Sequence, residues 1–171
     1  MENRFHLIFY PFFIFMAILI LVFQSSFLSF FFVRRSTPDL LLIVVLCFAF
    51  FGGENKGLVL GLIAGFCQDI IFGPAIGIFT LAKMLSAFLT GLVAREIYKD
   101  QIIGPALTVF FITFFHEIII FFMISLWGGG SPQLSLSLRS LLPRAVSHLL
   151  LTIPIYPLLY RAGQKNFFHP F

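Results

Sequence analysis

The stretch that decides the fold is Gly57–Gly77, with the sequence GLVLGLIAGFCQDIIFGPAIG. It is apolar enough for a membrane interior, and small residues recur in it at every fourth position, where Asp69 replaces one glycine. The glycines of this series are Gly57, Gly61, Gly65 and Gly73, and Gly77 closes the stretch. Residues four apart share one face of a helix, so this helix carries a narrow stripe without side chains. We expect a second helix to pack closely on that stripe.

The rest of the chain is similarly apolar. Of its 171 residues, 60% are hydrophobic and only 11% are charged, and the mean hydropathy is +1.04. A soluble domain of this size needs more polar surface, so we predict a single-domain integral membrane protein. The net charge of +4 comes from basic residues that flank apolar runs, which suits anchoring in a lipid bilayer better than binding nucleic acid. Cys47 and Cys67 lack the spacing of a metal or disulfide site.

Six apolar runs divide the chain, and each is predicted to be a transmembrane helix. The first is too long for a signal-peptide core and is expected to remain as a helix. The second opens with Pro38 and Asp39, a proline with no donor to lose and an acid that complements the helix dipole. The second and third helices are short and are expected to form a tight antiparallel hairpin. The fold class is therefore an all-α six-helix bundle with spans at 7–33, 38–53, 57–73, 75–94, 102–127 and 141–160.

The segments between the spans give a topology. Six helices place both termini on one side, and the connecting segments hold six basic residues on that side against four on the other. This excess favours cytoplasmic termini. The segment Gly128–Ser140 is predicted to be a loop, and Arg34 and Arg35 are predicted to lie in a tight turn.

Ionisable residues inside the spans are the candidate functional residues, because each costs about 2.5–3.5 kcal/mol or more at mid-bilayer. Asp69 continues the glycine stripe, so it is either a tie to another helix or a helix-end acid in reach of the headgroups. Lys83 lies mid-helix, where its stem reaches the interface only with strain, so we expect a buried partner, Asp69 or Glu117. The buried polar candidates are Gln68, Asp69, Lys83, His116 and Glu117.

The remaining polar residues in the spans do not form a catalytic set. His116-Glu117 begins like the zinc motif HExxH, but the fifth position is isoleucine, so a buried polar contact is expected instead of a metal site. Arg144 and His148 share a helix face and either meet a polar partner or face the headgroups. Gln24 either bonds to a neighbouring helix or lies near the interface. Because the chain also lacks GxSxG and phosphate-loop motifs, neither enzyme activity nor a cofactor is expected.

Two stretches together resemble the MreD family of rod shape-determining proteins. One is Ser36-Thr37-Pro38-Asp39 followed by three leucines, and the other is the G-x3-G-x3-G-x2-Q-D pattern within Gly57–Gly77. The length of the chain and its six predicted spans agree with that family. By layout the resemblance covers most of the chain, and by motif it is concentrated in residues 36–77.

The resemblance implies a non-enzymatic component of the bacterial elongation machinery in the cytoplasmic membrane, with the single-span protein MreC as its main partner. Through MreC, the family is linked to the filament protein MreB and to RodA with its penicillin-binding transpeptidase. The family is also similar in fold to substrate-binding subunits of energy-coupling-factor transporters. A scaffold is therefore the favoured prediction. A small-molecule transport subunit is the alternative, although the spans hold fewer polar residues than a water-soluble ligand usually needs.

Overall fold

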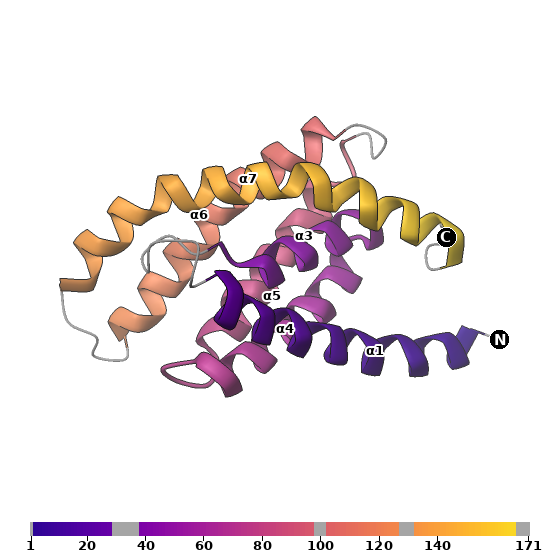
Figure 1. The fold of residues 1–171 in the computed structure, drawn as a ribbon, viewed down its shortest axis with the longest axis horizontal. Coiled ribbons are helices and arrows are strands. Elements are labelled where there is room, and N and C mark those ends of the chain that lie inside the picture. The colour runs from indigo at the N-terminus through magenta and orange to yellow at the C-terminus, as the bar shows by residue number, and fades with distance from the viewer. Residues whose placement is uncertain (1, 29–37, 98–101, 127–131, 167–171) are drawn as a thin grey trace.

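All regular structure in the described residues is helical. The computed structural model describes residues 2–28, 38–97, 102–126 and 132–166 (Figure 1). Its elements are α1 (Glu2–Phe23), the π-helix η1 (Gln24–Leu28), α3 (Leu40–Gly52), α4 (Glu54–Phe72), α5 (Ile78–Val93), α6 (Ile103–Leu126) and α7 (Pro132–Asn166). The predicted all-α class is confirmed for these residues. Three helical segments are long and apolar enough to cross a membrane, namely α4, α6 and the part of α7 from Leu141 to Arg161.

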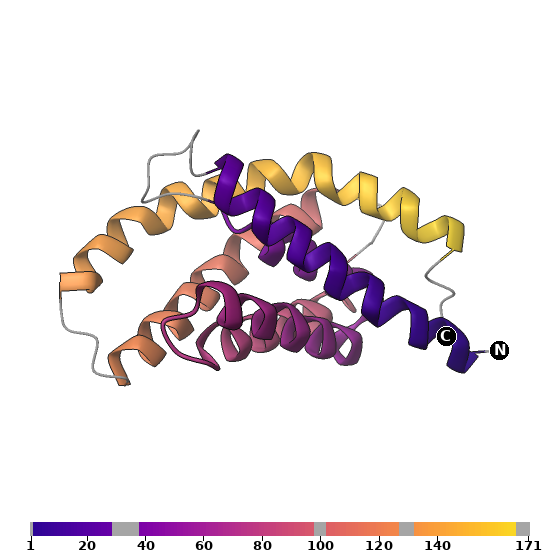
Figure 2. The same cartoon turned by 60° about the horizontal axis from the view of Figure 1, so that its bottom comes forward.

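Helix α3 lies at the centre of the molecule. It is the shortest of the described α-helices, yet it contacts α1, α4, α5, α6 and α7. Every side chain from Leu41 to Cys47 is buried, as expected for a helix that is apolar on all sides. Figures 1 and 2 show α1 on one side of it and the long arc of α7 on another. A helix this short can lie at the centre because protein surrounds most of it, so its length need not match the thickness of a lipid bilayer.

The glycine stripe of α4 packs on the backbone of α5. A Cβ atom added at any of three stripe positions would lie only 2.6–2.7 Å from a carbonyl oxygen of α5. The pairs are Gly57 with Ala87, Gly61 with Lys83, and Gly65 with Phe79. These carbonyls are also four residues apart, so the two helices touch backbone to backbone along one line.

The predicted hairpin of the second and third helices is formed by α3 and α4, but the pairing of α4 with α5 is closer. Helices α3 and α4 are joined by Gly53 alone and pack against each other. Gly53 has a φ of 80°, a left-handed conformation that favours glycine. A Cβ atom at Gly57 would also lie 2.7 Å from the Cβ of Ala49 in α3. The stripe therefore serves the α4–α5 contact first and the α3–α4 contact only at its beginning.

Helix α7 is longer than the sequence predicts. It begins at Pro132, so most of the expected loop Gly128–Ser140 is helical, and it continues through three internal prolines. Each proline removes a backbone donor, and Figure 1 shows the helix curving along its whole length. The start of α1 and the end of α7 lie at the same end of the molecule (Figures 1 and 2). Residues 29–33 of the first predicted span and the Arg34–Arg35 turn lie outside the described residues.

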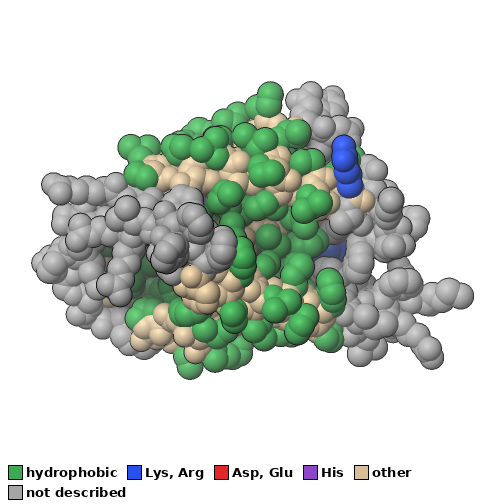
Figure 3. Space-filling view, viewed as in Figure 1, with side chains coloured by type: hydrophobic (Ala, Val, Ile, Leu, Met, Phe, Trp, Pro, Cys, Tyr) green, Lys and Arg blue, Asp and Glu red, His purple; other side chains and the backbone are tan. Residues whose placement is uncertain are grey.

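The outer surface is largely apolar. Figure 3 shows hydrophobic side chains over most of the described part of one face, with basic side chains toward the end where the termini lie. Large apolar side chains are exposed on α1, α4, α6 and α7 alike. Such a surface suits lipid or apolar protein contacts and places the polar groups of interest inside the bundle.

Candidate functional site

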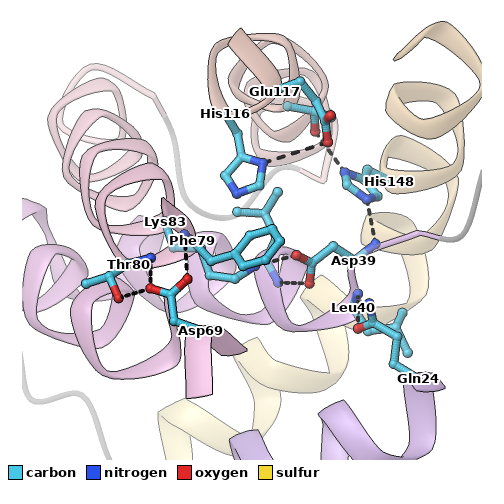
Figure 4. Close-up of polar contacts among 12 residues, drawn as sticks. Gln24, Asp39, Leu40, Asp69, Phe79, Thr80, Lys83, His116, Glu117 and His148 are labelled. Atoms are coloured by element: carbon cyan, nitrogen blue, oxygen red, sulfur yellow. Dashed lines mark hydrogen bonds and ion pairs between the residues drawn. The ribbon is translucent and has the colours of Figure 1, made fainter. Parts of the chain in front are cut away.

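The candidate site is a buried polar network around the start of α3 (Figure 4). Asp39 is the N-cap of this helix, and its Oδ1 accepts a hydrogen bond from Leu42 N at 2.9 Å. The backbone N–H of Asp39 donates to His148 Nε2 at 2.9 Å, and Leu40 N donates to Gln24 Oε1 at 3.1 Å. The first N–H groups of a helix have no partner within the helix, so η1 and α7 supply the acceptors that α3 lacks. Gln24 therefore bonds to a neighbouring helix, one of its two expected roles.

Lys83 of α5 completes the cap from the other side. Its Nζ forms an ion pair with Asp39 Oδ2, and the lysine side chain is fully buried. The prediction that Lys83 pairs with Asp69 or Glu117 is wrong. The Asp69 carboxylate bonds to N–H groups at the start of α5, and the Glu117 carboxylate bonds to Arg144. Pro38 is buried directly before the cap, outside the helix and not in its first turn. A buried lysine needs such a partner, since an unpaired charge away from water costs several kcal/mol, on the order of 3–5 kcal/mol when one member of a pair is removed.

Asp69, near the end of α4, accepts hydrogen bonds at the start of α5 as Asp39 does at the start of α3. Its carboxylate accepts backbone hydrogen bonds from Gly77, Phe79 and Thr80 at 2.8–3.0 Å, and one from the Thr80 hydroxyl at 2.5 Å. Gly77 has a φ of 107°, which a residue with a side chain adopts only with strain. Gly73 ends α4, where an added Cβ would lie 2.6 Å from the carbonyl oxygen of Asp69. Asp69 thus ties α4 to the first turn of α5.

His148 joins α7 to both α3 and α6. Its Nε2 accepts from Asp39 N, so in the neutral ring Nδ1 carries the proton and donates to Thr113 Oγ1 at 2.9 Å. The Thr113 hydroxyl in turn donates to Val109 O at 2.7 Å. Each atom in this chain of hydrogen bonds has one consistent role, which fixes the tautomer of His148.

A second ion pair joins α6 to α7. Arg144 donates to Glu117 Oε1 at 2.6 Å, so Arg144 meets an acidic partner, one of the two alternatives expected for it. His116 is buried next to this pair, with Nδ1 3.9 Å from the same carboxylate oxygen, too far for a hydrogen bond. Gln68 is buried as well, and its Oε1 has no hydrogen-bond partner within the described part of the chain.

The arrangement binds helices to one another. Two acids and two bases, Asp39 with Lys83 and Glu117 with Arg144, balance in formal charge. In the parts of the chain that the structure describes, no group of three His, Cys, Asp or Glu side chains is placed to hold a metal ion. The four charged groups neutralise one another in pairs, and Asp39 and Asp69 accept from N–H groups at helix starts, which is the chemistry of a structural network.

Some members of the network were not among the sequence candidates. Thr113 lies three residues before His116 and four before Glu117, so spacing alone places it on the polar face of α6. Thr80 carries no comparable signal, because its role depends on where α5 begins. The pairing of α3 with α5 and α7 is a tertiary property, and sequence spacing does not contain it.

One comparison with known proteins identifies a family. A family model described as rod shape-determining protein MreD matches residues 3–164. No curated protein and no solved structure matches the chain. The match spans all the helices described above, including the second half of the chain, where the sequence motifs are weakest.

Proposed function

Because this chain belongs to the MreD family of rod shape-determining proteins, we propose that it is a non-enzymatic membrane scaffold that binds MreC. Family membership implies the role in determining rod shape and, together with the three apolar segments, indicates a membrane protein. We propose further that six helices cross the bacterial cytoplasmic membrane with both termini in the cytoplasm. Binding to MreC would connect the protein indirectly to MreB and to RodA with its penicillin-binding transpeptidase in peptidoglycan synthesis.

The use of the buried charged groups is the observation that carries the scaffold proposal. Asp39, Lys83, Glu117 and Arg144 pair with one another across helices, and Asp69 caps α5. A charged group that is to act on a substrate must be able to contact it, whereas these groups are already engaged in holding the bundle together. This favours a protein that presents a rigid surface over one that performs chemistry.

The proposed contact with MreC is close apolar packing between helices in the membrane. Helix α1 is the surface that we propose, because it exposes a row of large apolar side chains and packs on the bundle through a few buried residues. The exposed residues are Phe12, Phe15, Leu19, Val22 and Phe23, and the buried ones are Phe13, Ala17 and Leu21. An exposed aromatic side chain offers large contact area to a partner helix at little entropic cost.

Affinity purification of the tagged full chain from membranes in mild detergent tests this function. We expect MreC among the recovered proteins, and a Phe15→Ala chain should recover less MreC at an unchanged thermal midpoint. Ile118→Ala, at an equally exposed position of α6, is the matched control and should recover the wild-type amount. Recovery of the ATPase subunits of a small-molecule transporter without MreC would support the alternative function, a transport subunit, and would overturn the scaffold.

A further inference from the structure

His116 is a buried residue whose two polar side-chain atoms both lack a hydrogen-bond partner among the described residues. Its side chain is only 2% exposed, and neither Nδ1 nor Nε2 has a hydrogen-bond partner among the residues that the structure describes. The nearest carboxylate oxygen, Glu117 Oε1, is 3.9 Å away and already accepts from Arg144. Buried polar groups in folded proteins are almost always hydrogen-bonded, so an imidazole in this position requires an explanation.

Lys83 also has hydrogen-bond donors without an acceptor among the described residues, and it lies on the side of α6 toward which His116 points. Figure 4 shows the His116 ring projecting from α6 on the side of the Asp39–Lys83 pair. An ammonium group has three donors, and Asp39 Oδ2 is the one acceptor that the described residues give Lys83 Nζ. Spare donors and an unpartnered imidazole therefore occur together inside the bundle.

The charges around this position define what would satisfy it. Asp39 and Glu117 are paired with Lys83 and Arg144, and the Asp69 carboxylate is held by N–H groups at the start of α5, so a charged ligand would add an uncompensated charge away from water. A neutral imidazole offers one donor and one acceptor, and a hydroxyl group can both give and receive a hydrogen bond. An oxygen that accepts from Lys83 and donates to the unprotonated nitrogen of His116 would satisfy that nitrogen and a second donor of Lys83.

We propose that His116 and Lys83 bind a neutral hydroxyl-bearing molecule inside the bundle, either water or the hydroxyl group of a lipid headgroup. A buried water typically makes about two to four hydrogen bonds to groups that otherwise lack partners, and His116 and Lys83 provide two. The bound hydroxyl joins α5 to α6, a link that no direct side-chain bond between these helices supplies in the described residues. The site is independent of which partner protein the surface binds.

Solid-state NMR of the histidine-labelled full chain in nanodiscs tests the site. A phosphatidylcholine bilayer lacks headgroup hydroxyls and a phosphatidylglycerol bilayer has them, so the two compositions separate the two sources. We expect the His116 ring nitrogens to show hydrogen-bonded shifts and a contact to water protons in both bilayers, or to lipid protons in phosphatidylglycerol alone. Ring shifts of an unbonded imidazole in both bilayers, or a contact to another side chain of the protein, would overturn the proposal.

The His116 signals are assigned from their loss in a His116→Gln chain. If this variant does not fold, a His6→Gln/His169→Gln chain leaves only two of the four histidines. His148 is then identified by its contact to Thr113, and the remaining signals belong to His116. The measurement on the wild-type rings therefore remains decisive in either case.

Discussion

Replacement of Lys83 by methionine tests how far one buried ion pair stabilises this bundle. The substitution keeps the length of the side chain and removes its charge, which leaves the Asp39 carboxylate, only 13% exposed, without a cation. Removing one member of a buried pair typically costs about 3–5 kcal/mol of unfolding free energy. Asp39→Asn should cost a similar amount, because it leaves a fully buried ammonium group unpaired. The amide oxygen of asparagine can still accept from Leu42 N, so this variant removes the charge and not the cap.

The double variant distinguishes an ion pair from two independent residues. With both charges gone, nothing buried is left uncompensated, and the loss should fall to about 1–2 kcal/mol, smaller than either single loss. The coupling free energy in the double-mutant cycle is then at least about 4 kcal/mol. The measurement is equilibrium unfolding of the purified full chain in mixed micelles. Single losses that add in the double variant would refute the pairing.

The pair of Arg95, just after α5, with Glu54 at the start of α4 is a control. Arg95 is 62% exposed, and its Nε donates to Glu54 Oε2 at 3.0 Å. A pair with an exposed member contributes about 0–1 kcal/mol, because solvent screens the attraction. Arg95→Gln should therefore change the unfolding free energy far less than Lys83→Met does in the same micelles.

Three further substitutions test the other contacts by the thermal midpoint of the purified chain. Gly61→Ala should lower the midpoint by the equivalent of about 1–3 kcal/mol, because its Cβ would meet the α5 backbone, whereas Leu62→Ala on the exposed face should have little effect. Asp69→Ala should cost about 2 kcal/mol or more, since it leaves three N–H groups of α5 without an acceptor, and Asp69→Asn should restore part of the loss. His148→Phe should cost about 1–3 kcal/mol by leaving Asp39 N unpaired, and a midpoint at or above that of wild type would contradict the hydrogen bond.

Local features of the sequence predict much of the fold, because they depend on residues near one another in the chain. The four-residue spacing of Gly57, Gly61 and Gly65 requires a close neighbour, and Pro38-Asp39 marks the start of a helix. The identity of that neighbour does not follow from the spacing, since a stripe accepts any helix that fits. The extra length of α7 was missed because the alternating serines and leucines before residue 140, together with Pro143, are weak helix signals.

The partner of Lys83 shows why the site was harder to predict than the fold. Asp39 is separated from Lys83 by 44 positions, whereas Asp69 is much nearer to it in sequence. The cost of burying a lysine predicts that a partner exists but not which acid it is. Asp69 is excluded by a competing demand, because the free N–H groups of α5 already occupy its carboxylate.

The position of Asp69 in the glycine series follows from the same geometry. As α4 proceeds from Gly57 to Gly65, its stripe meets carbonyl oxygens of α5 in reverse order, from Ala87 back to Phe79. One turn further along α4, the next position of the stripe lies beside the start of α5. The N–H groups there are donors that have no carbonyl partner within the helix. A glycine there would leave these N–H groups unbonded, whereas a carboxylate accepts three of them. The interruption in the glycine pattern therefore marks the place along α4 where its neighbour changes from helix body to helix end.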